Sequence, residues 1–155
     1  MDTSTIPGSG PNVRSLAKEA TVAASPMTAW TAWTTSEEIA AWWGPPASNV
    51  DLRIGGQFEM LFDIEAEPGS QGGEGCKYLG YVPGEMISFT WNAPPHIPLR
   101  TSNTWVVITF TQVDDGTHVR LVHTGFLDGA DWDDYMDYFQ QAWEFVLGLF
   151  VDHWA

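Results

Sequence analysis

Apolar and polar positions alternate along the middle of the chain, and this alternation predicts β-strands. In the first run, Phe58, Met60, Phe62 and Ile64 alternate with mostly acidic neighbours. A period of two is typical of a half-buried strand, because successive side chains point to opposite faces of a sheet. Turn sequences rich in glycine and proline separate the runs, so neighbouring strands are expected to be antiparallel. The predicted strands cover residues 58–64, 77–82, 87–91, 106–113 and 119–123.

The spacing of apolar residues changes to threes and fours over residues 131–154, which predicts one long amphipathic helix. The acidic segment 128–137 suits a helix start, because the positive end of the helix dipole favours carboxylates. It lacks the ordered spacing of a calcium-binding loop. The apolar stripe contains Met136, Phe139, Trp143, Val146, Leu147, Phe150 and Trp154. The polar face, expected to contact solvent, contains Asp134, Asp137, Gln141 and Glu144.

Two short helices are predicted over residues 26–43, after a first strand at residues 13–24. The Ser25-Pro26 pair suits a helix start, because serine caps free backbone N–H groups and proline fits the first turn. Ser36 is expected to cap the second helix. Gly44-Pro45-Pro46 is expected to end it, because glycine suits the exit and proline cannot continue a helix.

The sequence "AWWGPP" places Trp42 and Trp43 side by side at the end of the second helix. Neighbours on a helix point about 100° apart, so the two indoles cannot share one direction. One is expected to anchor the helix to the core and the other to lie at the mouth of a cavity. The alternative, that both pack in the core, stays open, because burial alone stabilises a large aromatic side chain.

The order of the elements predicts an α+β fold. A strand, two short helices, a run of antiparallel strands and a long helix suit one curved sheet wrapped around the C-terminal helix. Residues 12–155 are expected to form a single domain, and residues 1–11, rich in Ser, Thr, Gly and Pro, a flexible tail. The sequence shows neither a signal peptide nor a bilayer-spanning apolar stretch, so a cytoplasmic location is expected.

Charge and cysteine content exclude several classes of partner. The chain has 6 Lys+Arg against 20 Asp+Glu, a formal net charge of -14. Such a chain repels the phosphates of nucleic acids and an anionic membrane surface, so neither partner is expected. A single cysteine, Cys76, excludes an internal disulfide framework and a multi-cysteine metal site. Nine Trp and eight Phe can line a cavity as well as fill a core.

His123 is the one candidate for acid–base chemistry, because it lies in phase with Val119 and Leu121 and should point inward. It can serve as a general base or bond a polar ligand group. The alternative is a buried histidine bonded to a backbone carbonyl. His118 lies five residues away on the same strand and faces the opposite side, so the two cannot share a metal. No catalytic residue, metal or cofactor is therefore assigned.

The remaining candidates form a concave, mostly apolar surface between the sheet and the long helix. Such a surface suits a small hydrophobic or aromatic molecule. The alternative is that these side chains meet and fill the space. The candidate cavity residues are Trp42, Trp43, Phe58, Met60, Phe62, Phe89, Trp91, Val106, Ile108, Phe110, Leu121, His123, Met136, Phe139 and Trp143.

Five segments in order carry a resemblance to a known family. They are "VAASPMTAWTAWTTSEEIAAWWGP" (22–45), "DLRIGGQFEM" (51–60), "ISFTW" (87–91), "GTHVRLVHTGF" (116–126) and "QQAWEFVL" (140–147). The chain resembles the helix-grip superfamily of START-like (SRPBCC) domains and, within it, the homologues of the activator of heat-shock protein 90 ATPase. The resemblance implies a helix-grip fold. The chain departs from the family's usual pattern in its few basic residues and in the Pro-rich "APPHIPLR" (93–100).

Three functions are weighed. The first hypothesis is that the domain binds a small hydrophobic ligand without catalysis. The second is an enzyme of cyclase or hydrolase type that uses His123. The third is a co-chaperone-like protein-interaction domain, in which a chaperone contact is implied by the family resemblance alone. A homodimer also stays open. Fold-level analogy does not decide among these functions.

Overall fold

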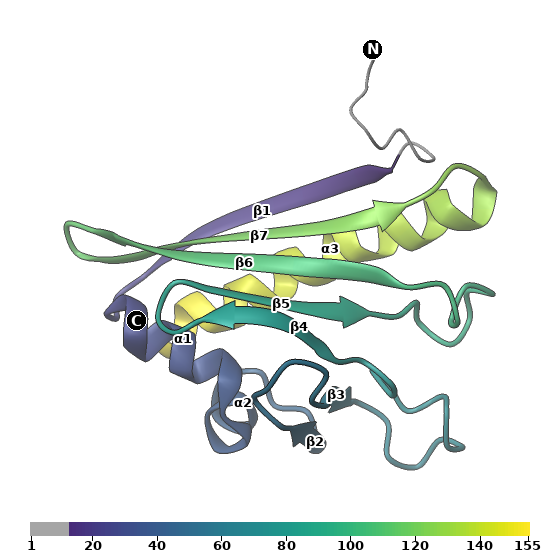
Figure 1. The fold of residues 1–155 in the computed structure, drawn as a ribbon, viewed down its shortest axis with the longest axis horizontal. Helices are drawn as coiled ribbons and strands as arrows, with labels where there is room; N and C mark the ends of the chain where they lie inside the picture. The colour runs from purple at the N-terminus through teal and green to yellow at the C-terminus, as the bar shows by residue number, and fades with distance from the viewer. Residues whose placement is uncertain (1–12) are drawn as a thin grey trace.

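The computed structural model describes residues 13–155 (Figure 1). The tail expected at residues 1–11 lies outside this range. The elements, in chain order, are β1 (Arg14–Val22), α1 (Pro26–Thr34), α2 (Ser36–Trp42), β2 (Ala47–Val50), β3 (Phe58–Leu61), β4 (Tyr78–Val82), β5 (Met86–Trp91), β6 (Thr104–Val113), β7 (Gly116–Phe126) and α3 (Ala130–His153).

Five strands form one antiparallel sheet in the order β1-β7-β6-β5-β4. The long helix α3 runs across one face of this sheet, and α1 and α2 lie beside its β4 end (Figure 1). The α+β class and the helix-grip arrangement predicted from the sequence are therefore confirmed. The two short helices lie between the first two strands, as expected.

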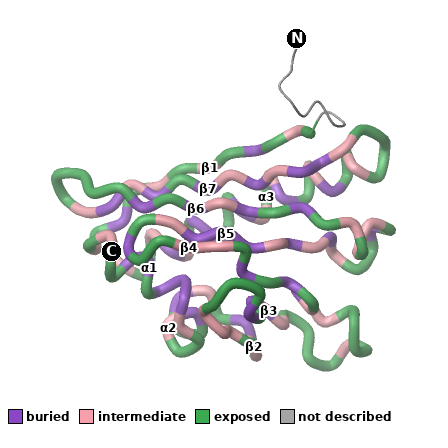
Figure 2. Tube along the Cα trace, viewed as in Figure 1, coloured by how far each residue is buried: buried purple, intermediate pink, exposed green. Residues whose placement is uncertain are grey.

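The alternation of side chains explains which face of the sheet meets α3. On β6, Val106, Ile108 and Phe110 are buried, whereas Trp105 and Thr109 are exposed. β7 pairs with β6 so that Val106 lies opposite His123. Figure 2 shows buried and accessible positions alternating along these strands. The inner face is thus apolar, as the period of two predicts.

Local capping fixes the two short helices. The Ser25 side chain accepts a hydrogen bond from the Thr28 N–H at 3.2 Å, as the serine–proline start predicts. The second helix differs slightly from expectation, because Thr35 precedes it and Ser36 is its first residue. Gly44 ends it with a φ of 84° and donates its N–H to the Ile39 carbonyl at 3.1 Å. This left-handed conformation is one that glycine adopts without strain.

The strand predicted at residues 58–64 is shorter in the structure, and a strand before it was missed. β3 ends at Leu61, because the backbone N–H groups of Phe62 and Asp63 both donate to the Gln71 carbonyl and close a loop. Phe62 is consequently 46% exposed rather than inward-facing. β2 pairs with β3 in a separate two-stranded sheet. Its four residues, "ASNV", carry no apolar alternation to predict it.

The helix α3 buries the stripe that the sequence predicts. Phe139, Trp143 and Phe150 are at most 6% exposed, whereas Met136 and Trp154 are half-buried. Tyr135, which the stripe did not include, is fully buried. The polar face is exposed as expected at Asp134, Asp137, Gln141 and Glu144. Among residues 13–155, no helix is both long and apolar enough to cross a membrane.

We expect Trp143→Ala to lower the free energy of unfolding by about 3–5 kcal/mol, the usual cost of deleting a large core aromatic. Trp143 is 1% exposed. Urea unfolding followed by circular dichroism measures the change. The matched control is Phe145→Ala on the same helix, at a side chain 67% exposed, which should cost less than about 1 kcal/mol. Equal losses in the two variants would contradict a core role for Trp143.

Candidate functional site

An open groove of about 1100 Å³ runs along one side of α3. Its other walls are the loop after β3, residues 62–73, and the loop after β5, residues 92–100. Four aromatic side chains from three separate parts of the chain form its floor. They are Trp43, Trp91, Phe139 and Trp143. The groove therefore lies at the edge of the sheet–helix interior rather than inside it.

Arg100 ties the two loops of the groove together. Its Nη1 donates to the Gly72 carbonyl at 2.9 Å and to the Ala93 carbonyl at 2.6 Å. Its Nη2 donates to the Gly69 carbonyl and, at 3.3 Å, to the Glu74 carboxylate. One guanidinium thus joins segments 26–31 residues apart in sequence. Because hydrogen bonds from a charged donor are stronger than neutral ones, this clamp fixes the walls of the groove.

Glu74 organises the loop from within. Its carboxylate accepts hydrogen bonds from the N–H groups of Gly69, Gln71 and Gly72, the last at 2.9 Å. Desolvation alone would raise the pKa of this carboxyl, but the backbone donors outweigh it and hold the pKa below its usual range. The charged form is therefore the stable one, and the Gly-rich loop has a defined shape despite its composition.

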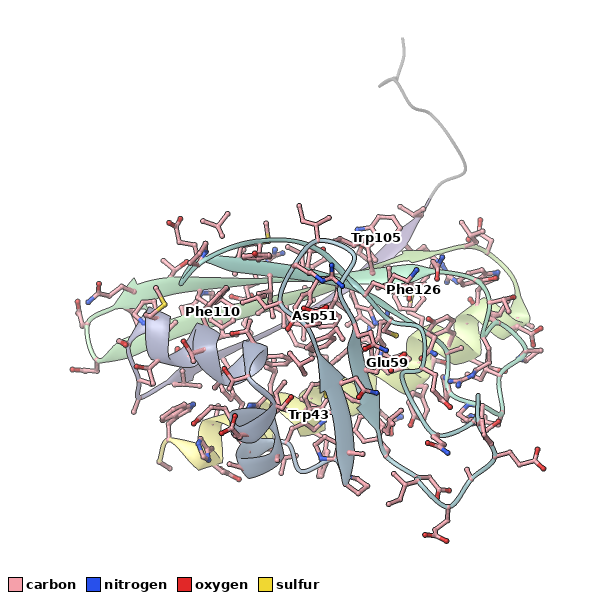
Figure 3. All side chains as sticks on the ribbon, turned by 60° about the horizontal axis from the view of Figure 1, so that its bottom comes forward. Trp43, Asp51, Glu59, Trp105, Phe110 and Phe126 are labelled. Carbon is pink, nitrogen blue, oxygen red and sulfur yellow. The ribbon has the colours of Figure 1, made fainter. Side chains whose placement is uncertain are left out.

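The tryptophan pair divides between the core and the groove. Trp42 is 4% exposed, and its Nε1 donates to the Ala32 carbonyl at 2.7 Å. Trp43 is half-buried and stacks on Trp91, with ring centroids 5.9 Å apart. Figure 3 labels Trp43 where α2, the β2–β3 pair and α3 come together. The phase of the helix thus sends one indole inward and the other to the groove floor.

His123 lies at the centre of a buried hydrogen-bond network. Its Nδ1 accepts from the Trp143 Nε1–H at 3.0 Å, so the ring proton is assigned to Nε2, which faces Thr104 Oγ1 at 2.8 Å. Thr104 donates to the Trp91 carbonyl at 2.6 Å, and the Tyr135 hydroxyl donates to the same carbonyl at 2.7 Å. The sequence placed His123 inward correctly, but its partners are side chains rather than the expected backbone carbonyl.

Burial decides the charge of His123. Desolvation lowers its pKa to about 3, because the protonated ring would lose its hydration. Both ring nitrogens are engaged, and the residue does not border the groove. His123 therefore joins α3 to the sheet through Trp143. His118 faces the other side of the sheet, as expected, and contacts Glu19 at 2.7 Å.

The structure brings together five of the fifteen candidate cavity residues. Trp43, Phe62, Trp91, Phe139 and Trp143 border the groove. The other ten lie elsewhere, nine of them buried in the packed interior and one half-buried on α3. These ten are Trp42, Phe58, Met60, Phe89, Val106, Ile108, Phe110, Leu121, His123 and Met136.

The interior side chains meet and fill the space under the sheet. The rings of Phe58 and Phe89 lie 4.2 Å apart, and those of Trp91 and Trp143 lie 5.2 Å apart. The single cysteine, Cys76, is also in this interior, and desolvation raises its pKa to about 11. Within residues 13–155, no group of three or more His, Cys, Asp and Glu side chains is placed to hold a metal ion.

Sequence reasoning missed the walls of the groove. The segment 92–98 and the loop 70–73 border it, as do Ala142, Phe145 and Leu149 on α3. One signal was available, because these three helix positions recur at spacings of three and four. The loop walls gave no such signal, since they are positioned by the distant Arg100.

The sequence profile of the Activator of Hsp90 ATPase homolog 1-like protein family matches residues 23–153. The chain belongs to this family. The match spans both short helices, the strands β2 to β7 and all of α3, which confirms the family resemblance drawn from the five sequence segments. A search of curated proteins found no match.

Solved structures share the fold at low sequence identity. A protein from Mesorhizobium loti is 22% identical over 90% of this chain and 96% of its own, with a TM-score of 0.73. An AHSA1-like protein from Rhizobium etli is 20% identical over 91% of this chain and 81% of its own, with a TM-score of 0.63. The Aha1 dimer from Colwellia psychrerythraea is 18% identical over 91% of this chain and 96% of its own, with a TM-score of 0.69. Identities this low establish the fold alone.

We expect the buried His123 to make stability depend on pH. In the unfolded chain its pKa returns to about 6.5, so between about pH 6.5 and pH 3 only the unfolded state binds the proton. His123 should therefore lower the free energy of unfolding by about 1.4 kcal/mol for each pH unit below pH 6.5. Urea unfolding at several pH values compares wild type with His123→Gln, and His118→Gln is the control. Identical slopes in wild type and His123→Gln would contradict the account.

We expect Arg100→Gln to loosen the groove walls without unfolding the chain. Losing the guanidinium removes its hydrogen bonds to three loop carbonyls and its ion pair with Glu74. The amides at residues 69–74 should therefore exchange roughly thirtyfold faster, which corresponds to a loss of about 2 kcal/mol in local opening free energy. Hydrogen–deuterium exchange measures this. The control, Arg53→Gln, removes a 74% exposed side chain whose ion pair is with Asp51. Unchanged exchange in Arg100→Gln would show that the clamp is not required.

Proposed function

We propose that this protein binds a small hydrophobic or aromatic molecule in the groove beside α3, without catalysing a reaction. The observation that carries the proposal is that aromatic side chains along the groove remain accessible to solvent. Trp43 is half-buried there, and Phe62 and Phe145 on the walls are 46% and 67% exposed. An apolar ligand that covers this surface removes it from water, and this burial favours binding by about 25 cal/mol per Å² of apolar area.

The size and chemistry of the groove support this proposal. Ligand sites are commonly concave, about 300–1,000 Å³ in volume and mostly apolar, with a few polar groups that orient the ligand. The groove, at about 1100 Å³, is slightly larger than this range, and its floor is aromatic. Arg100 and Glu74 hold its walls in place before any ligand arrives, which lowers the entropic cost of binding.

Two observations favour binding over the cyclase- or hydrolase-type alternative. His123, the one acid–base candidate of the sequence, is neutral, buried and outside the groove. His96 borders the groove, but among the described residues it forms no hydrogen bond to a carboxylate or hydroxyl that would orient it as a base. A general base must lie within hydrogen-bond reach of the substrate proton that it removes, with its ring held in the correct orientation. Neither histidine meets this requirement.

A second candidate is a protein-interaction domain, favoured by the same exposed Phe145. The relative from Colwellia psychrerythraea is described as a dimer, so a second copy of this chain is one partner to consider. A homodimer built on this groove would cover Phe145 and exclude small ligands. Light scattering at rising protein concentration distinguishes the two candidates, because only self-association raises the apparent mass.

We expect one molecule of the neutral probe N-dansyl-5-aminopentanol to bind per chain. We expect micromolar affinity, a binding free energy of about -8 kcal/mol. Burial of an aromatic ligand supplies a free energy of this order after the entropic cost of association is subtracted. Tryptophan-to-dansyl energy transfer measures binding. Ala142→Trp should abolish it by filling the groove, whereas Ala17→Trp, at an exposed position on β1, should not. Absent binding, or binding that survives Ala142→Trp, would contradict the proposed function, and circular dichroism checks that both variants fold.

A further inference from the structure

We propose that the groove selects a cationic amphiphile, a molecule with an aromatic or apolar body and an ammonium group at one end. This inference rests on the proposed function and names the chemical class that the groove takes. The ammonium lies among Asp131, Asp134 and Asp137, and the apolar body lies against the aromatic floor. The argument rests on how charge and apolar surface are distributed along the groove.

The helix α3 gives the groove one acidic and one apolar end. Asp131 and Asp134 border it near the start of the helix, and Phe145 and Leu149 border it near the end. At a rise of about 1.5 Å per residue, Asp131 and Leu149 lie about 27 Å apart along the axis. Figure 1 places the loop after β5 at the end of the sheet where α3 begins, so this loop faces the acidic end. A ligand along the groove therefore meets carboxylates at one end and apolar side chains at the other.

Helix capping does not account for this acidic end. The dipole favours carboxylates within the first turn of a helix, which explains Asp131 and Asp133. Asp134 and Asp137 lie beyond that turn, where the dipole contributes little. Both are exposed and border the groove. Their carboxylates therefore add negative charge to this end of the groove without a capping role at the start of α3.

The carboxylates of the acidic end are not neutralised by the described part of the chain. Among residues 13–155, the nearby Arg14 pairs with Asp128 and, at 2.8 Å, with Asp133, and no ion pair includes Asp131, Asp134 or Asp137. These three carboxylates, close together on one helix face, repel one another. A bound cation relieves that repulsion, whereas a bound carboxylate or phosphate increases it.

The positively charged groups that border the groove do not reverse the negative sign of its charge. Arg100 is engaged by the Glu74 carboxylate and three loop carbonyls. His96 lies beside Tyr138, with ring centroids 5.7 Å apart, and is the other basic side chain on the described walls. Asp63 adds a fourth carboxylate near the floor. The net charge of -14 also raises the local concentration of cations around the whole molecule.

The aromatic floor is compatible with a cation as well as with an apolar ring. The side chains of Trp43 and Phe62 both border the groove, with ring centroids 5.9 Å apart. Indole and phenyl faces attract ammonium groups through the negative charge of their π-systems. The aromatic side chains therefore do not repel the ammonium group of a cationic amphiphile. The carboxylates then fix which end of the groove that ammonium group occupies.

Three probes of one shape test the inference. Each carries a dansyl ring on a five-carbon chain, and the chain ends in an ammonium (dansylcadaverine), a hydroxyl or a carboxylate. We expect the ammonium probe to bind about tenfold more tightly than the hydroxyl probe, because two or three exposed ion pairs contribute that much. The carboxylate probe should bind more weakly than the hydroxyl probe. Added salt should reduce the preference for the ammonium probe and leave the hydroxyl probe nearly unchanged.

Charge-matched variants locate the effect. The triple variant D131N/D134N/D137N should lower the affinity of the ammonium probe about tenfold, to that of the hydroxyl probe. The control, E85Q/D114N/D115N, removes the same charge from the turns at the other end of the sheet and should retain most of the preference. Circular dichroism verifies that both variants fold.

The outcomes separate this inference from the proposed function. Binding of the hydroxyl probe alone, or equal binding of all three probes, overturns the cationic preference and leaves the proposed function standing. Equal losses in the two triple variants also overturn it, because the preference would then arise from net charge. Failure of every probe to bind contradicts the proposed function itself. An ammonium preference lost only in D131N/D134N/D137N supports the inference.

Discussion

The contact between Trp143 and His123 is the interaction on which the rest of this structure depends. The indole Nε1–H of α3 donates to a fully buried imidazole of β7, at 3.0 Å. Both groups are costly to bury without a partner, so each requires the other. The same indole packs against Trp91, with ring centroids 5.2 Å apart, and borders the groove. The contact that docks the helix on the sheet therefore also builds the floor of the candidate site.

This arrangement explains why the candidate site lies at an edge and not in the interior. Large aromatic side chains fill the space between the sheet and α3. The candidate site therefore lies outside this packed interior. The accessible apolar surface of the groove lies along one side of α3, beside the loops after β3 and β5. Arg100 and Glu74 hold those loops, and Trp43 closes the floor from α2.

Periodicity predicted the strands β3 to β7 and the long helix with its buried face, and capping residues predicted the two short helices, because each of these depends on side chains that are neighbours in sequence. It also placed His123 inward, but it left open whether Trp42 and Trp43 divide between the core and the groove or both pack in the core. It could not place Phe62, because the strand ends where a distant carbonyl, that of Gln71, closes a loop. It could not find the groove walls either, since they depend on Arg100 contacting residues far back in the chain. Patterns of two and 3.6 residues carry no information about such long-range contacts.

Methyl NMR during titration with N-dansyl-5-aminopentanol tests the central claim most directly, because it distinguishes the groove from the interior residue by residue. The account predicts that the methyl signals of Ile97 and Leu149, which border the groove, shift with the binding curve. Those of Ile108 and Leu121, buried between the sheet and α3, should stay unchanged. Shifts at Ile108 and Leu121 with Ile97 and Leu149 unmoved would place the ligand in the interior and contradict the account.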